Sequence, residues 1–317
     1  MSKYKIRHIT KYEYENPVRD SANQIMLYPI KDSYQQIIQH TLTITGNPVV
    51  DLYFDPFGNQ VGTFTQAKPH KELIIDSKLI VETFPHRVPD DSTPSDLQWL
   101  ELNTLKQQVE FIDYLRIERF DGLIEMGNII EAERCKHCTP YVTAKDFCEY
   151  IYRNFEYKKG ITTVETTLDE VWSLRSGVCQ DFAHILLVML RVVGIPARYV
   201  SGYICPKKNG MRGEGATHAW VEAYIPFYGW LGLDPTNNIY VDETHVKLAV
   251  GKNFSDCSPV KGTYRGTSTH TLEVSVTVGY EDGQTTDGEH EVIKPEVKPA
   301  SRKNSFRRHQ EMQMQQQ

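Results

Sequence analysis

Three side chains of the types needed for nucleophilic acyl transfer occur in the second half of this 317-residue chain: Cys179, His218 and Asp234. A thiolate can attack a carbonyl carbon and form a thioester, an imidazole can move the protons, and a carboxylate can hold the imidazole in one tautomer. The three residues lie far apart along the chain. This chemistry is therefore possible only if the elements that carry them bring the side chains together.

The sequence around Cys179 predicts a helix that begins close to this residue. Gly194 and Pro196 supply a glycine C-cap and then a residue that cannot continue the helix. A sulfur at a helix N-terminus lies near the positive end of the dipole, which favours the thiolate, and the unpaired N–H groups there can bind an oxyanion. Gly177 is expected to let the chain approach the substrate closely. One helix face is apolar, through Phe182, Ile185, Leu186, Met189, Leu190 and Val193.

His218 and Asp234 lie in two aromatic-rich segments that are expected to pair as strands. Alternation places His218 on one face of the first strand, and a short turn at residues 226–228 leads into a second strand at residues 229–233. In an antiparallel hairpin centred on residue 226, His218 and Asp234 would fall opposite each other. The carboxylate could then hold one ring nitrogen while the other faces Cys179.

Each of these residues also has an ordinary structural explanation. Free cysteines usually pack as small apolar residues, and Asp-Pro often begins a turn. His184 lies five residues after Cys179, on a different side of the helix, so it is expected to be a core residue rather than the base. Asp181, in the first helical turn, is expected to point away from the sulfur. These explanations account for each residue singly but not for the joint arrangement.

The whole chain predicts an α+β protein with an antiparallel β module at the N-terminus. Period-two alternation gives way near residue 88 to apolar residues at three- and four-residue spacing, which indicates helices from about residue 95 to 155. A clean alternation at residues 270–278 predicts a final strand, and the charged, Pro- and Gln-rich end is expected to be disordered. The predicted units are residues 1–88, residues 89–282 with the catalytic core and final strand, and a tail at 283–317. The expected N-terminal strands are 4–14, 36–45, 49–54, 60–66 and 72–82.

Composition excludes some classes of function. The net charge is -6, and 35 basic and 41 acidic residues are interspersed, so neither nucleic acid nor an anionic membrane is an expected partner. Six cysteines, none in the first 134 residues, do not suggest a disulfide framework, and reduced thiols in the cytoplasm are expected. The first residues have no apolar h-region, and no apolar stretch approaches about 20 residues, so neither export nor a membrane span is expected.

Cys135-Lys-His-Cys138 has the spacing of half a zinc site. A complete site needs a second pair of ligands, which the sequence does not supply, so thiols at a helix edge are the favoured interpretation. No acidic loop has the ligand spacing of a calcium site. No metal and no cofactor is therefore expected.

Several motifs resemble those of the bacterial transglutaminase-like proteins, a family often described as cysteine proteases. The resemblance covers roughly residues 3 to 280 and implies a papain-like α+β core, in which a helix carrying the cysteine packs on an antiparallel sheet, behind a β-rich N-terminal region. It implies the triad Cys179, His218 and Asp234. The motifs are Gly177-Val-Cys-Gln-Asp-Phe-Ala-His, Gly194-Ile-Pro-Ala-Arg-Tyr-Val-Ser-Gly-Tyr, Thr217-His-Ala-Trp and Gly229-Trp-Leu-Gly-Leu-Asp-Pro-Thr-Asn.

The fold resemblance leaves the reaction open. In a hydrolase of peptide or amide bonds, water resolves the thioester, whereas in a protein-glutamine transamidase an amine does. A third hypothesis is a noncatalytic interaction module with the β region as its docking surface, which an intact triad disfavours. Hydrolysis is preferred, because water is always present and amine selectivity requires a dry acceptor site. A protein or peptide substrate is the expected partner, and the sequence leaves the natural substrate, oligomeric state, regulation and role of the β module open.

Overall fold

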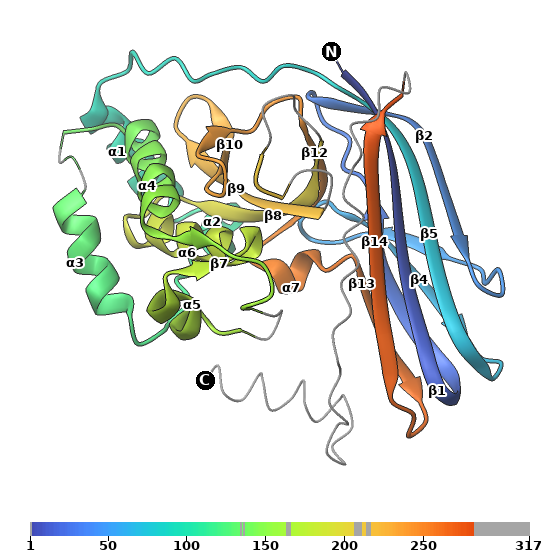
Figure 1. Cartoon of the computed structure of the whole chain (residues 1–317). Helices are drawn as coiled ribbons and strands as arrows, with labels where there is room; N and C mark the ends of the chain where they lie inside the picture. The colour runs from blue at the N-terminus through green and yellow to red at the C-terminus, as the bar shows by residue number, and fades with distance from the viewer. Residues whose placement is uncertain are drawn as a thin grey trace.

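The structure is a computed structural model that describes residues 2–133, 135, 137–162, 166–205, 211–213 and 217–281. The predicted tail, residues 283–317, lies outside the described residues. Figure 1 shows two sheets and a group of helices: the helices cover one side of the smaller sheet, and the larger sheet stands on its other side. This arrangement agrees with the predicted α+β class.

The larger sheet is built around β1 (Ser2–Tyr28), which pairs with four other strands. Its main path has the order β2-β5-β1-β4-β3, and β13 and β14 also pair with β1. The expected strand ended at residue 14, but β1 continues to Tyr28, because the break at Pro17 is absorbed by a register shift between Glu13 and Val18. The other strands are β2 (Gln35–Ile44), β3 (Asp51–Phe54), β4 (Gln60–Gln66), β5 (His70–Thr83), β13 (Val260–Arg265) and β14 (His270–Tyr280).

The final strand, β14, pairs with a strand of the larger sheet, whereas the predicted units grouped it with the catalytic core. β14 runs antiparallel to β1 from the pair Tyr4 and Tyr280 to the pair Tyr14 and His270. Alternation along a strand shows that one face is buried, but it does not identify the neighbouring strand. The larger sheet therefore combines the start of the chain with residues 260–280, while the division into residues 1–88 and 89–282 stays a prediction.

All helices except α7 lie in sequence between β5 of the larger sheet and β8 of the smaller sheet, and they pack mainly around α6 (Cys179–Val192). Apart from the half-buried His184, residues 181–191 of α6 are all buried, which is why this helix forms the centre of the main core. As predicted, Gly194 terminates the helix just after its last residues: its φ is +83°, and the Ile195 N–H donates to the Leu190 carbonyl at 3.0 Å. The other helices are α1 (Ser95–Leu105), α2 (Val109–Leu115), α3 (Leu123–Glu133), α4 (Pro140–Asn154), α5 (Leu168–Leu174) and α7 (Phe254–Cys257).

The smaller sheet has the strand order β11-β10-β9-β8-β12, and all its pairs are antiparallel. One face packs on α6, and side chains of the other face, such as Tyr203 and Val246, join the core of the larger sheet. A separate two-stranded parallel sheet, β6 (Glu156–Tyr157) with β7 (Ser176–Gly177), comes directly before Cys179. The strands are β8 (Ala197–Ile204), β9 (Thr217–Ile225), β10 (Gly229–Asp234), β11 (Ile239–Tyr240) and β12 (His245–Gly251).

Two side-chain amides from the N-terminal region close the outer edge of the smaller sheet at β12. Gln35 accepts from the Lys247 N–H and donates to the Lys247 carbonyl, both at 2.8 Å. Asn59 does the same with Val250, at 2.8 and 2.7 Å. Backbone groups of an edge strand that would otherwise be unpaired are thus satisfied inside the molecule.

Charged side chains also connect the N-terminal region to β12 and its neighbouring strands. The Lys247 ammonium lies 2.6 Å from a Glu222 oxygen on β9 and 2.9 Å from Asp32, which follows β1. Arg198 on β8 completes the cluster, 2.6 Å from the other Glu222 oxygen. Burial alone would raise the pKa of Glu222, but Lys247 and Arg198 outweigh it and lower the pKa to about 2.

The cysteines correct one expectation. Cys135 and Cys138 form a disulfide with their Cα atoms 5.3 Å apart, whereas reduced thiols were predicted. Just before α4, the Cys138 N–H donates to the Cys135 carbonyl at 3.2 Å, which keeps the two cysteines within bonding reach. The paired sulfurs are not available as zinc ligands.

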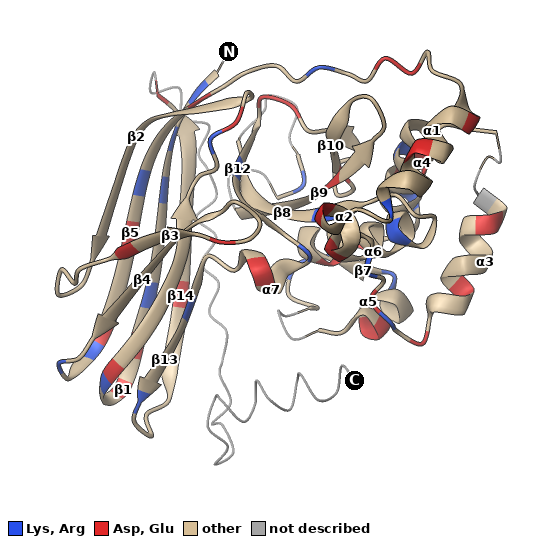
Figure 2. Ribbon diagram, turned by 180° about the vertical axis from the view of Figure 1, so that it is seen from behind, with Lys and Arg blue, Asp and Glu red and all other residues tan. Residues whose placement is uncertain are grey.

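The distribution of charged residues and the length of the helices are relevant to which partners the protein could bind. Figure 2 shows Lys and Arg interspersed with Asp and Glu over the larger sheet and the helices, as the composition predicted. In the described parts of the chain, no helix is long and apolar enough to cross a membrane.

Candidate active site

Cys179 is the first residue of α6, as the sequence predicted. The short sheet before it fixes the approach of the chain, because the Lys158 N–H donates to the Gly177 carbonyl at 2.8 Å. Of the four free cysteines in the described residues, Cys179 is the one that is not fully buried. Burial raises the pKa of the other three thiols, so they stay protonated and inert; they are Cys148, Cys205 and Cys257.

Asp181 supports the start of this helix. Its carboxylate accepts from the Val178 N–H at 2.8 Å and from the Thr162 hydroxyl at 2.7 Å. A Cβ at Gly177 would lie 2.4 Å from the Asp181 carboxylate. Gly177 therefore makes room for Asp181, while the close approach of the chain to a substrate stays a prediction.

His218 and Asp234 meet in the interior of the protein. His218, on β9, lies with its Nε2 2.9 Å from Oδ2 of Asp234, at the end of β10, and both side chains are wholly buried. The register differs from the predicted one by two residues: Leu233 pairs with Val221, so Asp234 lies diagonally rather than directly opposite His218. The hairpin turns at Phe227, with φ at +65°, and the diagonal neighbours on one face still reach each other.

The Asp234 carboxylate is held by several donors. Oδ1 accepts from the backbone N–H groups of Thr236 at 2.8 Å and Asn237 at 3.3 Å, and Oδ2 accepts from the Asn237 side chain at 2.7 Å. Burial alone would raise the pKa of Asp234, but the charge and hydrogen bond of His218 outweigh it and hold the pKa well below its usual range. The carboxylate is therefore ionised throughout the neutral range.

The imidazole of His218 has one ring nitrogen engaged and one available. Burial alone would lower its pKa, but Asp234 and the Cys179 sulfur outweigh it and raise the pKa to about 10. Nδ1 is buried and forms no hydrogen bond of normal geometry with the described residues. The Cys179 sulfur is close enough to the ring to contribute to this higher pKa.

A second histidine, which the sequence did not indicate, contacts the same carboxylate oxygen of Asp234 as His218. Nε2 of His245, the first residue of β12, is 3.4 Å from Asp234 Oδ2, and its ring packs edge-on against Trp220 with ring centres 5.3 Å apart. Nitrogens of His218 and His245 and an oxygen of Asp234 lie within 4.8 Å of one another. These are ligand types that a divalent ion accepts, but hydrogen bonding accounts for the arrangement by itself.

His184 lies away from this site. Its Nε2 accepts from the Phe254 N–H at 3.2 Å, and burial lowers its pKa to about 4. This agrees with the expectation that His184 is a core residue and not the base.

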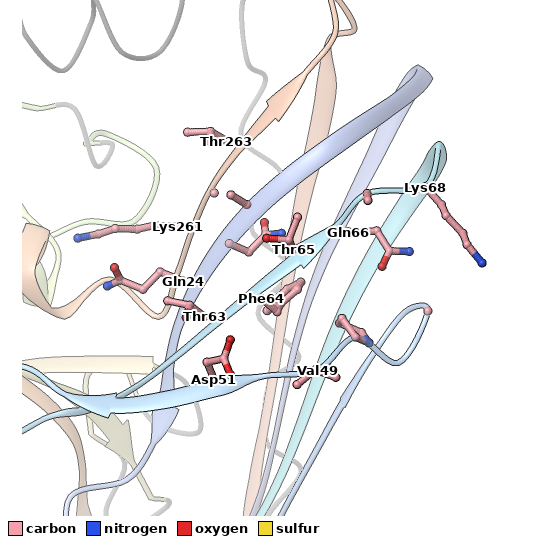
Figure 3. Close-up of a pocket in the computed structure, with 16 residues that line it drawn as sticks. Gln24, Val49, Asp51, Thr63, Phe64, Thr65, Gln66, Lys68, Lys261 and Thr263 are labelled. Atoms are coloured by element: carbon pink, nitrogen blue, oxygen red, sulfur yellow. The ribbon is translucent and has the colours of Figure 1, made fainter.

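A separate cavity of 890 Å³ opens over the larger sheet (Figure 3). Its walls come from β1, β3, β4, β13 and the segments that flank β3 and β4, and none of its lining residues belongs to an element that carries Cys179, His218 or Asp234. The labelled side chains are mostly hydroxyls, amides and charged groups, including Gln24, Thr63, Thr65, Lys261 and Thr263.

Comparison with known proteins places this geometry in a family. Residues 132–235 match the transglutaminase-like superfamily, and residues 4–82 match the bacterial transglutaminase-like N-terminal region. The protein ML0607 of Mycobacterium leprae is 31% identical over 282 residues, which cover 88% of this chain and 99% of the relative. The chain belongs to the transglutaminase-like superfamily.

Other members show how far the likeness extends. The crystal structure of a "putative cysteine protease" from Cytophaga hutchinsonii has a TM-score of 0.71 and 21% identity, and covers 92% of this chain and 96% of that one, so the two share the transglutaminase-like fold. A protein-glutamine gamma-glutamyltransferase of Pseudomonas aeruginosa is 36% identical over 90 residues, which cover 27% of this chain and 14% of that enzyme.

Proposed function

We propose that this protein is a thiol-dependent enzyme that hydrolyses peptide or amide bonds, with Cys179 as nucleophile, His218 as proton carrier and Asp234 as the carboxylate that holds the imidazole. One observation carries the proposal. The buried His218–Asp234 pair, 2.9 Å apart, lies beside a partly exposed thiol at a helix N-terminus, with the free ring nitrogen not otherwise bonded.

The reaction proceeds in two halves. The Cys179 thiolate attacks the carbonyl carbon of the substrate, and the first-turn N–H groups of α6 face the oxyanion that forms. The imidazolium of His218 then gives its proton to the nitrogen, the C–N bond breaks, and the amine leaves a thioester on Cys179. The neutral imidazole next takes a proton from water, whose oxygen attacks the thioester. The C–S bond breaks, the carboxylic acid leaves, and the thiolate–imidazolium pair is restored.

Transfer to an amine is the alternative, and one observation favours it. The 90 residues that resemble the Pseudomonas aeruginosa enzyme belong to a protein-glutamine gamma-glutamyltransferase. The first half-reaction is the same for both activities, so only the second acceptor distinguishes them. Water remains our preferred acceptor, because an amine that reacts in its place must be held in a site that excludes water.

Incubation with a glutamine-containing casein digest and a labelled primary amine tests the proposal. New peptide termini or released ammonia without incorporated amine are expected in the wild type, and neither is expected in Cys179→Ala. Incorporation of the amine as the main product would replace hydrolysis by transamidation. Turnover by Cys179→Ala equal to that of the wild type would remove the mechanism altogether.

The expected cellular setting is part of the same proposal. A protein or peptide substrate, with neither nucleic acid nor membrane as partner, fits the interspersed surface charges. The proposed location is the cytoplasm. Fractionation of the native host with antibody detection tests this, and recovery of the protein outside the cytoplasmic fraction would contradict it.

A further inference from the structure

Asn237 lies three residues after Asp234 and contacts its carboxylate twice. The side-chain Nδ2 donates to Oδ2 at 2.7 Å, and the backbone N–H donates to Oδ1 at 3.3 Å. Oδ2 is also the oxygen that accepts from His218. Because Asn237 bonds to both carboxylate oxygens, it restricts rotation of the group that orients the imidazole.

The same amide also holds a segment of chain that is distant in sequence. The Arg212 N–H donates to Asn237 Oδ1 at 2.8 Å, and Asn237 Nδ2 donates to the Arg212 carbonyl at 3.3 Å. These two reciprocal bonds reproduce the pairing of a strand neighbour. The Arg212 guanidinium adds a second attachment, since it lies 4.4 Å over the ring of Tyr152 on α4.

The segment held in this way borders the imidazole. A Cβ on Gly213 would lie 3.4 Å from Nδ1 of His218 and 3.4 Å from the Tyr157 hydroxyl. Gly213 has a φ of +75°, which favours glycine at this position. The bare backbone of residue 213 therefore lies against the ring nitrogen that has no hydrogen bond of normal geometry and that faces Cys179.

We propose that Asn237 is a positioning residue that uses one amide group for two tasks. It fixes the Asp234 carboxylate against His218, and it ties residues 211–213 over the edge of the imidazole that faces Cys179. The role rests on the proposed triad, because it acts through His218 on the reactivity of the sulfur. Groups near the ring are Cys179 from α6, Asp234 from β10 and His245 from β12, and the Tyr157 hydroxyl from β6 lies beside Gly213.

The experiment measures the alkylation rate of Cys179 by iodoacetamide at pH 7, with peptide mapping to resolve this cysteine from the buried ones. Asn237→Ala removes both tasks. Asn237→Asp keeps an acceptor for the Arg212 N–H but places a second carboxylate against Asp234. Both variants are expected to slow alkylation at least about tenfold, the factor that loss of one hydrogen bond to a charged group produces.

A second readout separates the two tasks. Hydrogen exchange of the Arg212 amide is expected to stay slow in Asn237→Asp, which retains the acceptor, and to become fast in Asn237→Ala. Asn154→Ala is the matched control, because this exposed asparagine on α4 bonds only to the Tyr150 carbonyl at 2.8 Å among the hydrogen bonds described. Its alkylation rate should equal that of the wild type.

The proposal would be overturned if Cys179 of Asn237→Ala were alkylated as fast as in the wild type. Slow hydrogen exchange of the Arg212 amide in this variant would also overturn it. Global unfolding of both Asn237 variants by circular dichroism would also overturn it, since the residue would then support the whole fold. Failure of the proposed function is distinguishable, because alkylation needs no substrate. A wild-type Cys179 that reacts no faster than the buried Cys257 would refute the triad itself, whereas fast alkylation without turnover would leave the role of Asn237 intact.

Discussion

The side-chain amide of Gln35 and the backbone of Lys247 exchange two hydrogen bonds of 2.8 Å. The Gln35 side chain thus makes the hydrogen bonds that a neighbouring strand would otherwise make with Lys247. Gln35 comes from the N-terminal region and Lys247 from β12, the strand that begins with His245. The N-terminal region therefore stabilises the strand that places a second imidazole beside Asp234.

Gln35→Ala is expected to destabilise the protein by about 2–4 kcal/mol, because it leaves a buried N–H and a buried carbonyl without partners. Gln36→Ala, at an exposed position of the same strand, is the matched control and should change the free energy of unfolding by less than about 0.5 kcal/mol. Denaturant unfolding measures both variants. Equal stability of the two would mean that the edge contacts of β12 are not needed.

Gly202 on β8 pairs with His218 on β9 and allows no side chain. A Cβ there would lie 2.1 Å from the Val246 carbonyl and 2.6 Å from the ring of Trp220. Gly202→Ala is expected to cost about 3 kcal/mol by overpacking, and to lower the melting temperature accordingly.

Gly127→Ala is the control for this prediction, because a Cβ on Gly127 in α3 would meet no atom within 4 Å. Its helical position should make the substitution neutral or stabilising by up to about 1 kcal/mol. Thermal unfolding followed by circular dichroism compares the two. A Gly202→Ala protein as stable as Gly127→Ala would contradict the packing described around β8.

Asp234→Asn should reduce kcat/KM by up to about 10⁴-fold and change the pH dependence of what remains. The Asp234 charge is the main influence that raises the pKa of His218 to about 10, against burial. Without that charge, burial prevails and the imidazole becomes neutral at lower pH. The alkaline limb of the activity profile is therefore expected to move to lower pH.

Nuclear magnetic resonance of ¹⁵N-histidine protein follows the same change without a substrate. The His218 signal, identified by its absence in His218→Gln, should report a charged ring at pH 8 in the wild type and a neutral ring in Asp234→Asn. A charged ring in both proteins would show that the carboxylate does not control this titration.

His8 is expected to make the free energy of unfolding decrease in acid. It is buried between β1 and β8, with Nδ1 3.0 Å from the Tyr203 hydroxyl, and burial lowers its pKa from 6.5 to about 4. The unfolded chain binds a proton at this histidine more readily than the folded protein does. Its contribution is therefore complete above pH 6.5 and is lost as the pH falls toward 4, on the order of 3 kcal/mol in total.

Urea unfolding at pH 7 and pH 4 checks this prediction against His8→Gln. The variant is expected to lose less stability on acidification than the wild type, by about the same 3 kcal/mol. If the wild type and the variant lost equal amounts of unfolding free energy between pH 7 and pH 4, groups other than His8 would cause the acid sensitivity.

Local patterns were enough to predict the start of the proposed site. The apolar stripe and the Gly194 cap predicted the helix that begins at Cys179, and the alternation around His218 predicted its strand. The register of the following hairpin was wrong, because Pro226, Phe227 and Tyr228 offered several turn centres and the left-handed conformation falls on a non-glycine residue, Phe227.

The supporting contacts could not be predicted, because they depend on tertiary neighbours. His245 reaches Asp234 only when β12 pairs with β8, and Asn237 reaches Arg212 only when a separate segment comes alongside. The partner of the final strand could not be predicted for the same reason. The alternation of this strand indicated a buried face, but the strand pairs with β1, more than 250 residues earlier in the chain.

The pairing of β1 with β14 has a consequence for the order of events at the ribosome. Translation reaches β1 long before its partner β14, and it reaches Cys179, His218 and Asp234 in between. Until residue 280 leaves the exit tunnel, one flank of β1 has no neighbour and is open to association with other nascent chains. Slow translation or early termination before β14 is thus expected to yield aggregates, which ties the yield of native protein to completion of a strand that contributes no residue to the proposed chemistry.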